Sequence, residues 1–221
     1  MKTTCEAIVI GGGVMGASIL SNLAAAGITN TILLEKSTIG AGSTGRSSGA
    51  IRMHYSTQVN ASLAHESLKV FTNFSDLVGG DVGFVNTGYM VFAPSEATQG
   101  FRENISMQQS VGISTREIDH VEAAELAPAF KIDEGEQVAW EEDSGHADPS
   151  ATALAYINHA RACGATIYLD TPVIDIKVSE SGSHKVKTEK ACFESNTVII
   201  ATGPWTSGIL EKVGISLPLL P

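Results

Sequence analysis

Cysteine is scarce in this chain, and its spacing argues against a structural zinc site. The 221 residues include three cysteines, Cys5, Cys163 and Cys192, which lie far apart and form no CxxC or Cys/His pattern. Cysteines with this spacing indicate a cytosolic protein in which they stay reduced and act as small apolar residues. They do not indicate a disulfide framework. We therefore expect no metal site and a cytoplasmic location.

Clusters of basic residues and long apolar runs are also missing. The chain has 14 Lys and Arg residues against 24 Asp and Glu residues, a formal net charge of −10. Because nucleic acids and anionic membranes bind a clustered basic face, we expect neither as a partner. No apolar stretch reaches the roughly 18 residues that span a bilayer. The apolar run after MKTT is a glycine-rich turn, which argues against a signal peptide.

Glycine, by contrast, is concentrated near the N-terminus in a GxGxxG pattern. Gly11, Gly13 and Gly16 follow a β-branched run over residues 8–10 and precede a helical stretch that Gly27 ends. In a dinucleotide-binding βαβ unit the first glycine permits the tight turn. The second lets a pyrophosphate approach the backbone, and the third lets helix and strand pack closely. The N–H groups at the helix start then bind the phosphates.

The acid that closes this unit narrows the choice of nucleotide. A second strand over residues 31–34 ends at Glu35. An acidic side chain there can accept hydrogen bonds from both hydroxyls of an adenosine ribose and would repel a 2′-phosphate. This disfavours NADP and leaves open which other dinucleotide binds.

The next segment, KSTIGAGSTGRSSGAIRMHYS, is rich in serine, threonine and glycine. It fits neither a regular helix nor a strand, so we interpret it as an ordered loop with many backbone donors and hydroxyls. The alternative is a flexible surface linker. A linker would seldom place Arg46, Arg52, His54 and Tyr55 among its glycines.

Apolar spacing predicts the remaining elements. A helix is expected over 58–78, ended by Gly79-Gly80, followed by β-rich, turn-punctuated sequence over 83–94. Further elements are a helix near 96–111, a strand near 114–118, a small helix before Pro128 and a strand near 138–141. This block predicts an antiparallel sheet with helices, distinct from the nucleotide unit.

The last third of the chain predicts a return to the first sheet. Asp148 and Pro149 mark a helix start, and Gly164 marks its end. Strands are expected in ATIYLD, VIDIKV and TVIIATGPW, with a polar hairpin through Ser181-Gly182. The predicted segments are 1–80 and 146–221 for a nucleotide domain and 81–145 for an inserted domain.

Several motifs together resemble those of a known family. They are the 11–16 fingerprint, the STGRSSGAIR loop, Gly88-Tyr89, SGHADPSA (144–151), TVIIATGPW (197–205) and the closing LPLLP. The chain resembles the FAD-dependent D-amino-acid oxidase superfamily, most of all its sarcosine oxidase β-subunit and dimethylglycine dehydrogenase-like branch. The resemblance implies an α/β fold, a Rossmann-like FAD-binding domain interrupted by part of an antiparallel-sheet α+β substrate domain.

The resemblance also implies roles for particular residues. The fingerprint would hold the FAD pyrophosphate, and Glu35 and Lys36 would meet the adenosine ribose. The loop would run beneath the pyrophosphate, the ribityl chain and the edge of the isoalloxazine. Val173 would contact adenine through its backbone, and Ala201 with Gly203 would close over the FAD. The full set is Gly11, Gly13, Val14, Met15, Gly16, Glu35, Lys36, Gly42, Ser43, Thr44, Arg46, Ser47, Ser48, Val173, Ala201 and Gly203.

The chemistry that the family implies is oxidation of a C–H bond next to an amine. A small-molecule amine would deliver a hydride to flavin N5, and the resulting imine would hydrolyse. No acid–base pair is needed if the amine binds neutral, so the protein would orient and desolvate the substrate. Arg52 matches an arginine near the flavin face, or else forms a salt bridge. His54 and Tyr55 are further candidates, or else packing residues.

Family members continue well beyond the LPLLP position. We therefore expect a truncated oxidase, one half of a split enzyme, or a stand-alone FAD-binding remnant. A sheet cut within a domain leaves an unpaired edge, which predicts a second chain or a homo-oligomer covering it. The main alternative function is a nucleotide-binding or partner-binding module without turnover. An NAD-dependent dehydrogenase is disfavoured by the Ala201-Thr202-Gly203 strand end and the STGRSSG loop.

Overall fold

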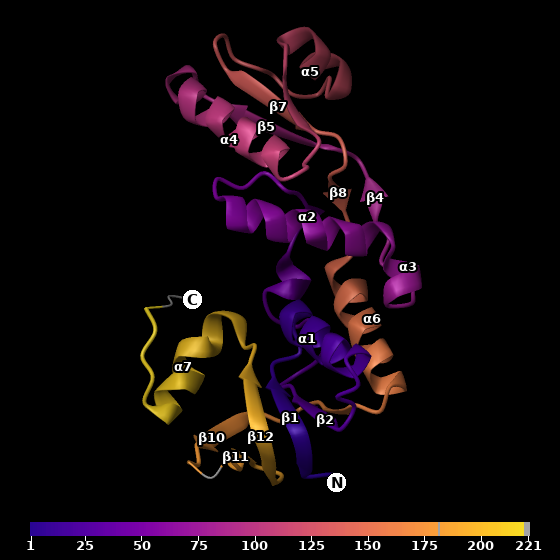
Figure 1. Cartoon of the computed structure of the whole chain (residues 1–221), viewed down its shortest axis with the longest axis vertical. Helices are drawn as coiled ribbons and strands as arrows, with labels where there is room; N and C mark the ends of the chain where they lie inside the picture. The colour runs from indigo at the N-terminus through magenta and orange to yellow at the C-terminus, as the bar shows by residue number, and fades with distance from the viewer. Residues whose placement is uncertain (181, 219–221) are drawn as a thin grey trace. The chain divides into compact units, whose positions relative to one another are not determined.

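The computed structural model describes residues 1–180 and 182–218, which form two compact units. The first unit consists of Met1–Ser48, Val78–Val82 and Asp148–Pro221. The second consists of Gly49–Leu77 and Gly83–Ala147. Figure 1 labels the main helices and strands of both units.

The first unit is built on a six-stranded sheet in the order β10-β11-β12-β1-β2-β9. Strands β1, β2, β9 and β12 pair in parallel, and β10, β11 and β12 pair antiparallel, as predicted for strands that return to the first sheet. Figure 1 shows β1 and β12 side by side. The bounds are β1 Thr4–Ile10, β2 Thr31–Leu34, β9 Thr166–Tyr168, β10 Val173–Lys177, β11 His184–Thr188 and β12 Cys192–Ile200.

The central strands of this sheet are buried on both faces. Ile8, Val9, Ile32 and Leu33 are fully buried, as expected for short apolar strands inside a parallel sheet. β1 begins at Thr4, earlier than the apolar run suggested, because Thr4–Glu6 alternates exposed and buried positions. Of the predicted hairpin after β10, Ser181 lies outside the described residues.

Two helices pack against each other in the first unit, α1 (Val14–Ala25) and α6 (Pro149–Ala162). The side chains of Ser21 and His159 form a hydrogen bond of 2.7 Å between them. At the start of α6, Asp148 accepts hydrogen bonds from the backbone N–H groups of Ser150 and Ala151, with Pro149 in the first turn. The shorter elements are η1 Thr44–Arg46, η3 Gly203–Trp205, α7 Thr206–Leu210 and η4 Glu211–Val213.

The second unit contains two three-stranded antiparallel sheets, β5-β7-β6 and β3-β8-β4. The predicted antiparallel sheet with helices is therefore confirmed. Its strands are β3 Ala50–Ile51, β4 Val85–Asn86, β5 Tyr89–Ala93, β6 Thr115–Ile118, β7 Gln137–Glu141 and β8 Gly145–His146. Its helices are α2 Gln58–Thr72, α3 Phe74–Leu77, η2 Ser95–Ala97, α4 Thr98–Ser110 and α5 His120–Leu126.

The helix predicted over 58–78 differs from the structure in two respects. It is divided at Asn73 into α2 and α3. It also packs into the second unit, because Ala61 and Leu68 join a core cluster with Met53 and Ile113. The contacts of residues 49–77 thus place them with the second unit, whereas the predicted segment 1–80 places them with the first. Apolar spacing shows which helix face is buried but does not identify the core it faces.

None of the helices within residues 1–180 and 182–218 combines the length and apolar character that a bilayer crossing requires.

Candidate cofactor site

The turn between β1 and α1 accepts only glycine at two positions. Gly11 has a φ of +108°, and a Cβ there would lie 2.5 Å from the carbonyl oxygen of Ala201. A Cβ on Gly16 would lie 1.9 Å from the carbonyl oxygen of Gly11. The backbone N–H of Ala201 donates to the carbonyl of Ile10 over 2.8 Å. The close packing of the helix on the strand and its turn that was predicted for the third glycine is therefore present. The approach of a pyrophosphate to Gly13 stays a prediction.

The start of α1 leaves backbone donors available to an anion. Its N-cap residue, Gly13, offers no side-chain acceptor, and the first turn holds no acidic residue. Within residues 1–180 and 182–218, the N–H groups of Gly13, Met15 and Gly16 have no hydrogen-bond partner. A helix N-terminus with unpaired N–H groups binds phosphate through those donors and the helix dipole.

Thr44 ties the serine- and threonine-rich loop to this helix start. Its Oγ1 accepts a hydrogen bond of 2.9 Å from the N–H of Val14. The loop is also held by Gly40, whose N–H donates to the carbonyl of Gly12 and whose carbonyl accepts from the N–H of Gly45. The loop is therefore ordered against the fingerprint, as predicted, and the flexible-linker interpretation is wrong.

Glu35 is anchored by the backbone on both of its carboxylate oxygens. Oε2 accepts from the N–H of Gly12 at 2.7 Å, and Oε1 accepts from the N–H of Ser37 at 2.8 Å. The residue is 9% exposed. A carboxylate has about four acceptor sites, so Glu35 retains capacity for ribose hydroxyls while its position is fixed.

Trp205 has a place in this region that the sequence did not reveal. The Nζ of Lys36 lies 3.9 Å from the centroid of its ring, a cation–π contact. A Cβ on Gly42 would lie 3.2 Å from the same ring. Two predicted cofactor-binding residues, Lys36 and Gly42, therefore lie next to the Trp205 ring, and Trp205 is 44% exposed. The available signal was its position directly after Ala201-Thr202-Gly203-Pro204.

Most of the remaining predicted cofactor residues are exposed on the first unit, whereas Val173 is half-buried. Ser43 precedes η1, and Arg46, Ser47 and Ser48 are exposed. Gly203 has open space around its Cβ position, and Val173 begins β10 against the core of the sheet. All sixteen predicted cofactor-binding residues belong to the first unit, and the three candidate catalytic residues belong to the second.

Arg52 is surrounded by aromatic rings rather than by acids. Its Cζ lies 5.0 Å from the ring centroid of Tyr55 and 5.6 Å from that of Tyr89. Its Nη1 donates to the carbonyl of His54 over 3.0 Å. Among the residues that the structure describes, no carboxylate pairs with Arg52, so the salt-bridge interpretation does not hold for them.

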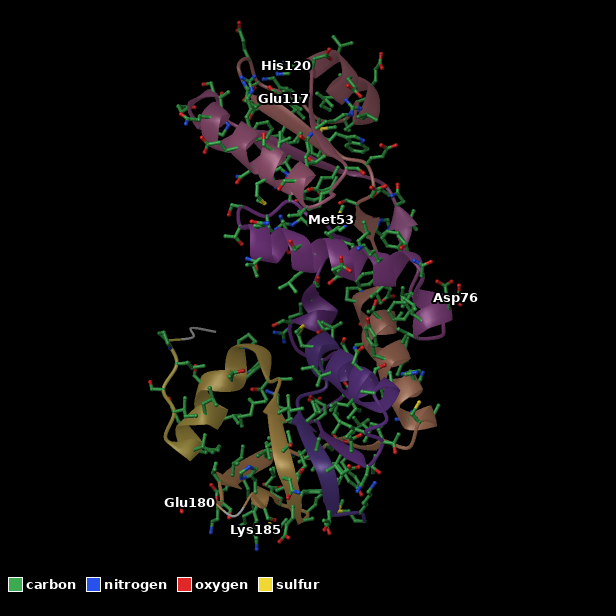
Figure 2. The ribbon with its side chains drawn as sticks, viewed as in Figure 1. Met53, Asp76, Glu117, His120, Glu180 and Lys185 are labelled. Atoms are coloured by element: carbon green, nitrogen blue, oxygen red, sulfur yellow. The ribbon has the colours of Figure 1, made fainter. Side chains whose placement is uncertain are left out.

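Tyr55 packs against the core cluster of the second unit, and its carbonyl accepts a hydrogen bond from Gln108. These contacts fit the packing interpretation that the sequence left open for Tyr55. Met53, labelled in Figure 2, lies in the same core and is 1% exposed.

His54 faces a buried acid that the sequence did not single out. Its Nδ1 lies 3.4 Å from Oε1 of Glu141, whose side chain is fully buried. Glu141 also accepts hydrogen bonds from the N–H of Met53 at 3.0 Å and from Oγ of Ser144 at 2.8 Å. His54 lines a cavity of about 400 Å³ together with residues of β5, α4 and the turn before it, namely Val91, Ala93, Ala97, Gly100, Phe101 and Asn104.

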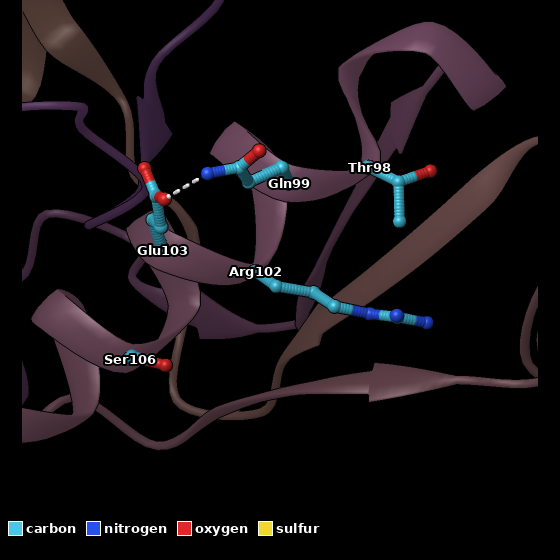
Figure 3. Close-up of a pocket in the computed structure, with 5 residues that line it drawn as sticks. All are labelled: Thr98, Gln99, Arg102, Glu103 and Ser106. Atoms are coloured by element: carbon cyan, nitrogen blue, oxygen red, sulfur yellow. Dashed lines mark hydrogen bonds between the residues drawn. The ribbon is translucent and has the colours of Figure 1, made fainter.

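A larger hollow, of about 660 Å³, lies on the exposed face of α4 (Figure 3). Its charged side chains, Arg102 and Glu103, already pair with protein atoms. Gln99 donates to Glu103, and Arg102 donates two hydrogen bonds to Glu117. The hydrogen bonds from Arg102 lower the pKa of Glu117. This hollow therefore offers no free charge to a ligand.

No group of three or more His, Cys, Asp and Glu side chains within residues 1–180 and 182–218 is placed to hold a metal ion.

The parallel sheet, the glycine turn and the free donors of α1 define a dinucleotide-binding protein of the Rossmann type. The chain belongs to the FAD dependent oxidoreductase family, DAO, whose sequence profile matches residues 6–221. FAD is the cofactor of that family, and the first unit offers the glycine cradle and helix terminus that its pyrophosphate needs.

Individual relatives agree with this assignment. Human dimethylglycine dehydrogenase (Homo sapiens) is 27% identical over 222 residues, which cover 100% of this chain and 26% of that protein. Glycine oxidase of Bacillus licheniformis is 28% identical over 233 residues, covering 100% of this chain and 60% of that protein. The crystal structure of L-proline dehydrogenase from P. horikoshii matches with a TM-score of 0.90 and 30% identity, over 97% of this chain and 57% of that chain. The chain thus spans about a quarter of the dimethylglycine dehydrogenase.

Proposed function

We propose that this protein acts as an FAD-dependent oxidoreductase on the C–H bond next to the amine of a small amino acid or N-methyl amino acid, such as sarcosine. The observation that carries the proposal is the glycine turn with unpaired donors at α1, in a chain of the FAD dependent oxidoreductase family. The relatives act on substrates of this class by their names, which supports the substrate assignment.

Different residues of the first unit would bind different parts of FAD. The N–H groups of Gly13, Met15 and Gly16 would hold the pyrophosphate, and Glu35 with Lys36 would bind the adenosine ribose. The loop of Gly42, Ser43, Thr44, Arg46, Ser47 and Ser48 would lie along the ribityl chain. Bound FAD supplies a hydride acceptor at its flavin ring.

The second unit supplies the groups that we assign to substrate. Arg52 has no carboxylate partner among the described residues, so its charge is available to the carboxylate of an amino acid. The rings of Tyr55 and Tyr89 restrict its position and lower its exposure to water. Orientation of the substrate and exclusion of water are the contributions expected from such groups.

The chain spans 26% of human dimethylglycine dehydrogenase, so a further segment or a second chain is part of this proposal. A truncated or split enzyme would obtain the rest of its substrate site from that source. A homo-oligomer that covers the sheet is the alternative partner. The alternative function is a non-catalytic FAD-binding module or subunit.

The test is titration of the purified chain with FAD, followed by anaerobic addition of amines. We expect a yellow protein with bound flavin, bleached by sarcosine, dimethylglycine, glycine or proline when the partner segment is present. Gly13→Trp should abolish the binding, and Gly208→Trp, at a glycine with open space around it, should retain it. A colourless protein that takes up no FAD would refute the proposal. A yellow protein that no amine bleaches would support the binding-module alternative.

A further inference from the structure

The two oxygens of the Glu141 carboxylate have different surroundings. Oε2 accepts the N–H of Met53 at 3.0 Å and the hydroxyl of Ser144 at 2.8 Å. Oε1 receives neither donor, and it faces Nδ1 of His54 at 3.4 Å. Within the described residues, neither Oε1 nor Nδ1 has a hydrogen-bond partner of its own. These two unpartnered atoms thus lie 3.4 Å apart, with the Glu141 side chain fully buried and the His54 side chain 11% exposed.

This pair constrains the proton on the imidazole. An ionised carboxylate only accepts hydrogen bonds, and a neutral imidazole has one N–H and one acceptor nitrogen. Two acceptor atoms placed next to each other without water would each lack a hydrogen-bond partner, which destabilises the folded state. The pair avoids this destabilisation when Nδ1 carries the proton and directs it at Oε1.

We propose that Glu141 is a positioning residue that sets the tautomer of His54, with the proton on Nδ1 and with Nε2 left as the acceptor. A carboxylate that accepts a hydrogen bond from Nδ1 also fixes the plane of the imidazole ring. The two donors to Oε2 hold the carboxylate in its position. Met53 donates from the residue before His54, and Ser144 donates from the turn after β7.

His54 lines a cavity, and we assign its Nε2 to a ligand bound there. It is lined chiefly by small apolar side chains and by the ring of Phe101, whose centroid lies 6.4 Å from that of His54. Asn104 contributes the other polar side chain. An acceptor nitrogen in such a cavity suits a small ligand with an N–H donor and apolar substituents, which is the chemistry of an N-methyl amine. This choice of ligand rests on the proposed function, whereas the tautomer does not.

The tautomer is measured directly by long-range ¹H–¹⁵N correlation spectra of the full chain labelled on its histidines. The signal of His54, one of six histidines, is assigned by its loss in His54→Gln. In the neutral ring we expect Nδ1 protonated and Nε2 unprotonated. A wild-type spectrum with the proton on Nε2 would overturn the proposal, because it would place a protonated carboxyl or no hydrogen bond opposite Nδ1.

Glu141→Gln provides a sharper test without changing the shape of the side chain. The donors from Met53 and Ser144 require the amide oxygen in the place of Oε2, so the NH₂ group takes the place of Oε1 and faces Nδ1. We expect the proton of His54 to move to Nε2. Retention of the wild-type tautomer in a folded Glu141→Gln protein would contradict the proposal.

Glu142→Gln is the matched control, because it removes one negative charge at the next position, which is exposed. It should leave the tautomer unchanged. Circular dichroism establishes that each variant is folded, and the wild-type spectrum decides the question if Glu141→Gln does not fold. The FAD titration is a separate measurement. Failure of the oxidoreductase proposal would therefore be distinguished from failure of the tautomer proposal.

Discussion

Thr44 accepts a hydrogen bond from the backbone N–H of Val14, so a side chain of the loop after β2 caps the first turn of α1. A helix start leaves its first N–H groups without intrahelical partners. Thr44 satisfies one of them from thirty residues away in sequence, and others remain for an anion. The same bond therefore ties the loop to the helix end at which we propose that the FAD pyrophosphate binds.

Thr44→Val removes this acceptor and keeps the shape of the side chain. We expect the free energy of unfolding to fall by about 1 kcal/mol, the usual effect of losing a capping oxygen. Urea unfolding measures it. Thr57→Val is the control, because Thr57 precedes α2 and makes no side-chain capping bond. Equal losses in the two variants would show that the Thr44 bond contributes nothing specific.

Gly16→Ala tests the close packing of α1 on the turn. The new Cβ would lie 1.9 Å from the carbonyl oxygen of Gly11, so the helix or the turn must shift. We expect a loss of about 1–3 kcal/mol in the free energy of unfolding and weaker FAD binding. Gly208→Ala adds the same methyl group to α7 in open space and should cause no loss. Thermal unfolding of both variants separates steric strain from a general effect of alanine.

Glu35→Ala removes an acceptor for two backbone N–H groups as well as for the ribose. We expect FAD binding to weaken by about 1–3 kcal/mol, as judged by calorimetric titration. The free energy of unfolding should also fall, because the N–H groups of Gly12 and Ser37 lose their partner. Glu6→Ala, an exposed acid on β1, is the control for charge. Unchanged FAD affinity in Glu35→Ala would exclude Glu35 from the ribose site.

Burial raises the pKa of the Cys5 thiol above its ordinary value of 9.0. The folded chain therefore keeps this proton to higher pH than the unfolded chain does. The contribution to stability is complete below pH 9.0 and is lost as the pH rises through the folded pKa. Cys5→Ala should reduce the decline in the free energy of unfolding above pH 9.0, whereas Cys192→Ala, at an exposed cysteine, should not. Parallel declines in wild type and Cys5→Ala would contradict this.

The fingerprint was predictable because its requirements are local. Gly11 directly follows β1 and Gly16 lies in the first turn of α1, so short-range spacing is sufficient evidence. The antiparallel character of the second unit was predictable for the same reason, since short β-rich runs alternate with turns. The core that α2 joins was not, because helical spacing identifies an apolar face without its partner.

The contacts that depend on distant residues were not predictable from sequence. Glu141 ends an ordinary strand, and its contact with His54 arises only when β7 meets the loop after β3. Trp205 was visible as part of a motif, but its contact with Lys36 depends on how two loops meet. Neither contact follows from a fixed spacing of residues that a single sequence would reveal.

The location of Trp205 in the first unit, against Lys36, also gives the chain an optical probe of its own. The chain has two tryptophans, Trp140 in the second unit and Trp205 in the first. Trp140→Phe would leave an emission signal from the first unit alone, and Trp205→Phe would leave one from the second. The order in which the two units unfold could then be followed in the native polypeptide, without an attached dye.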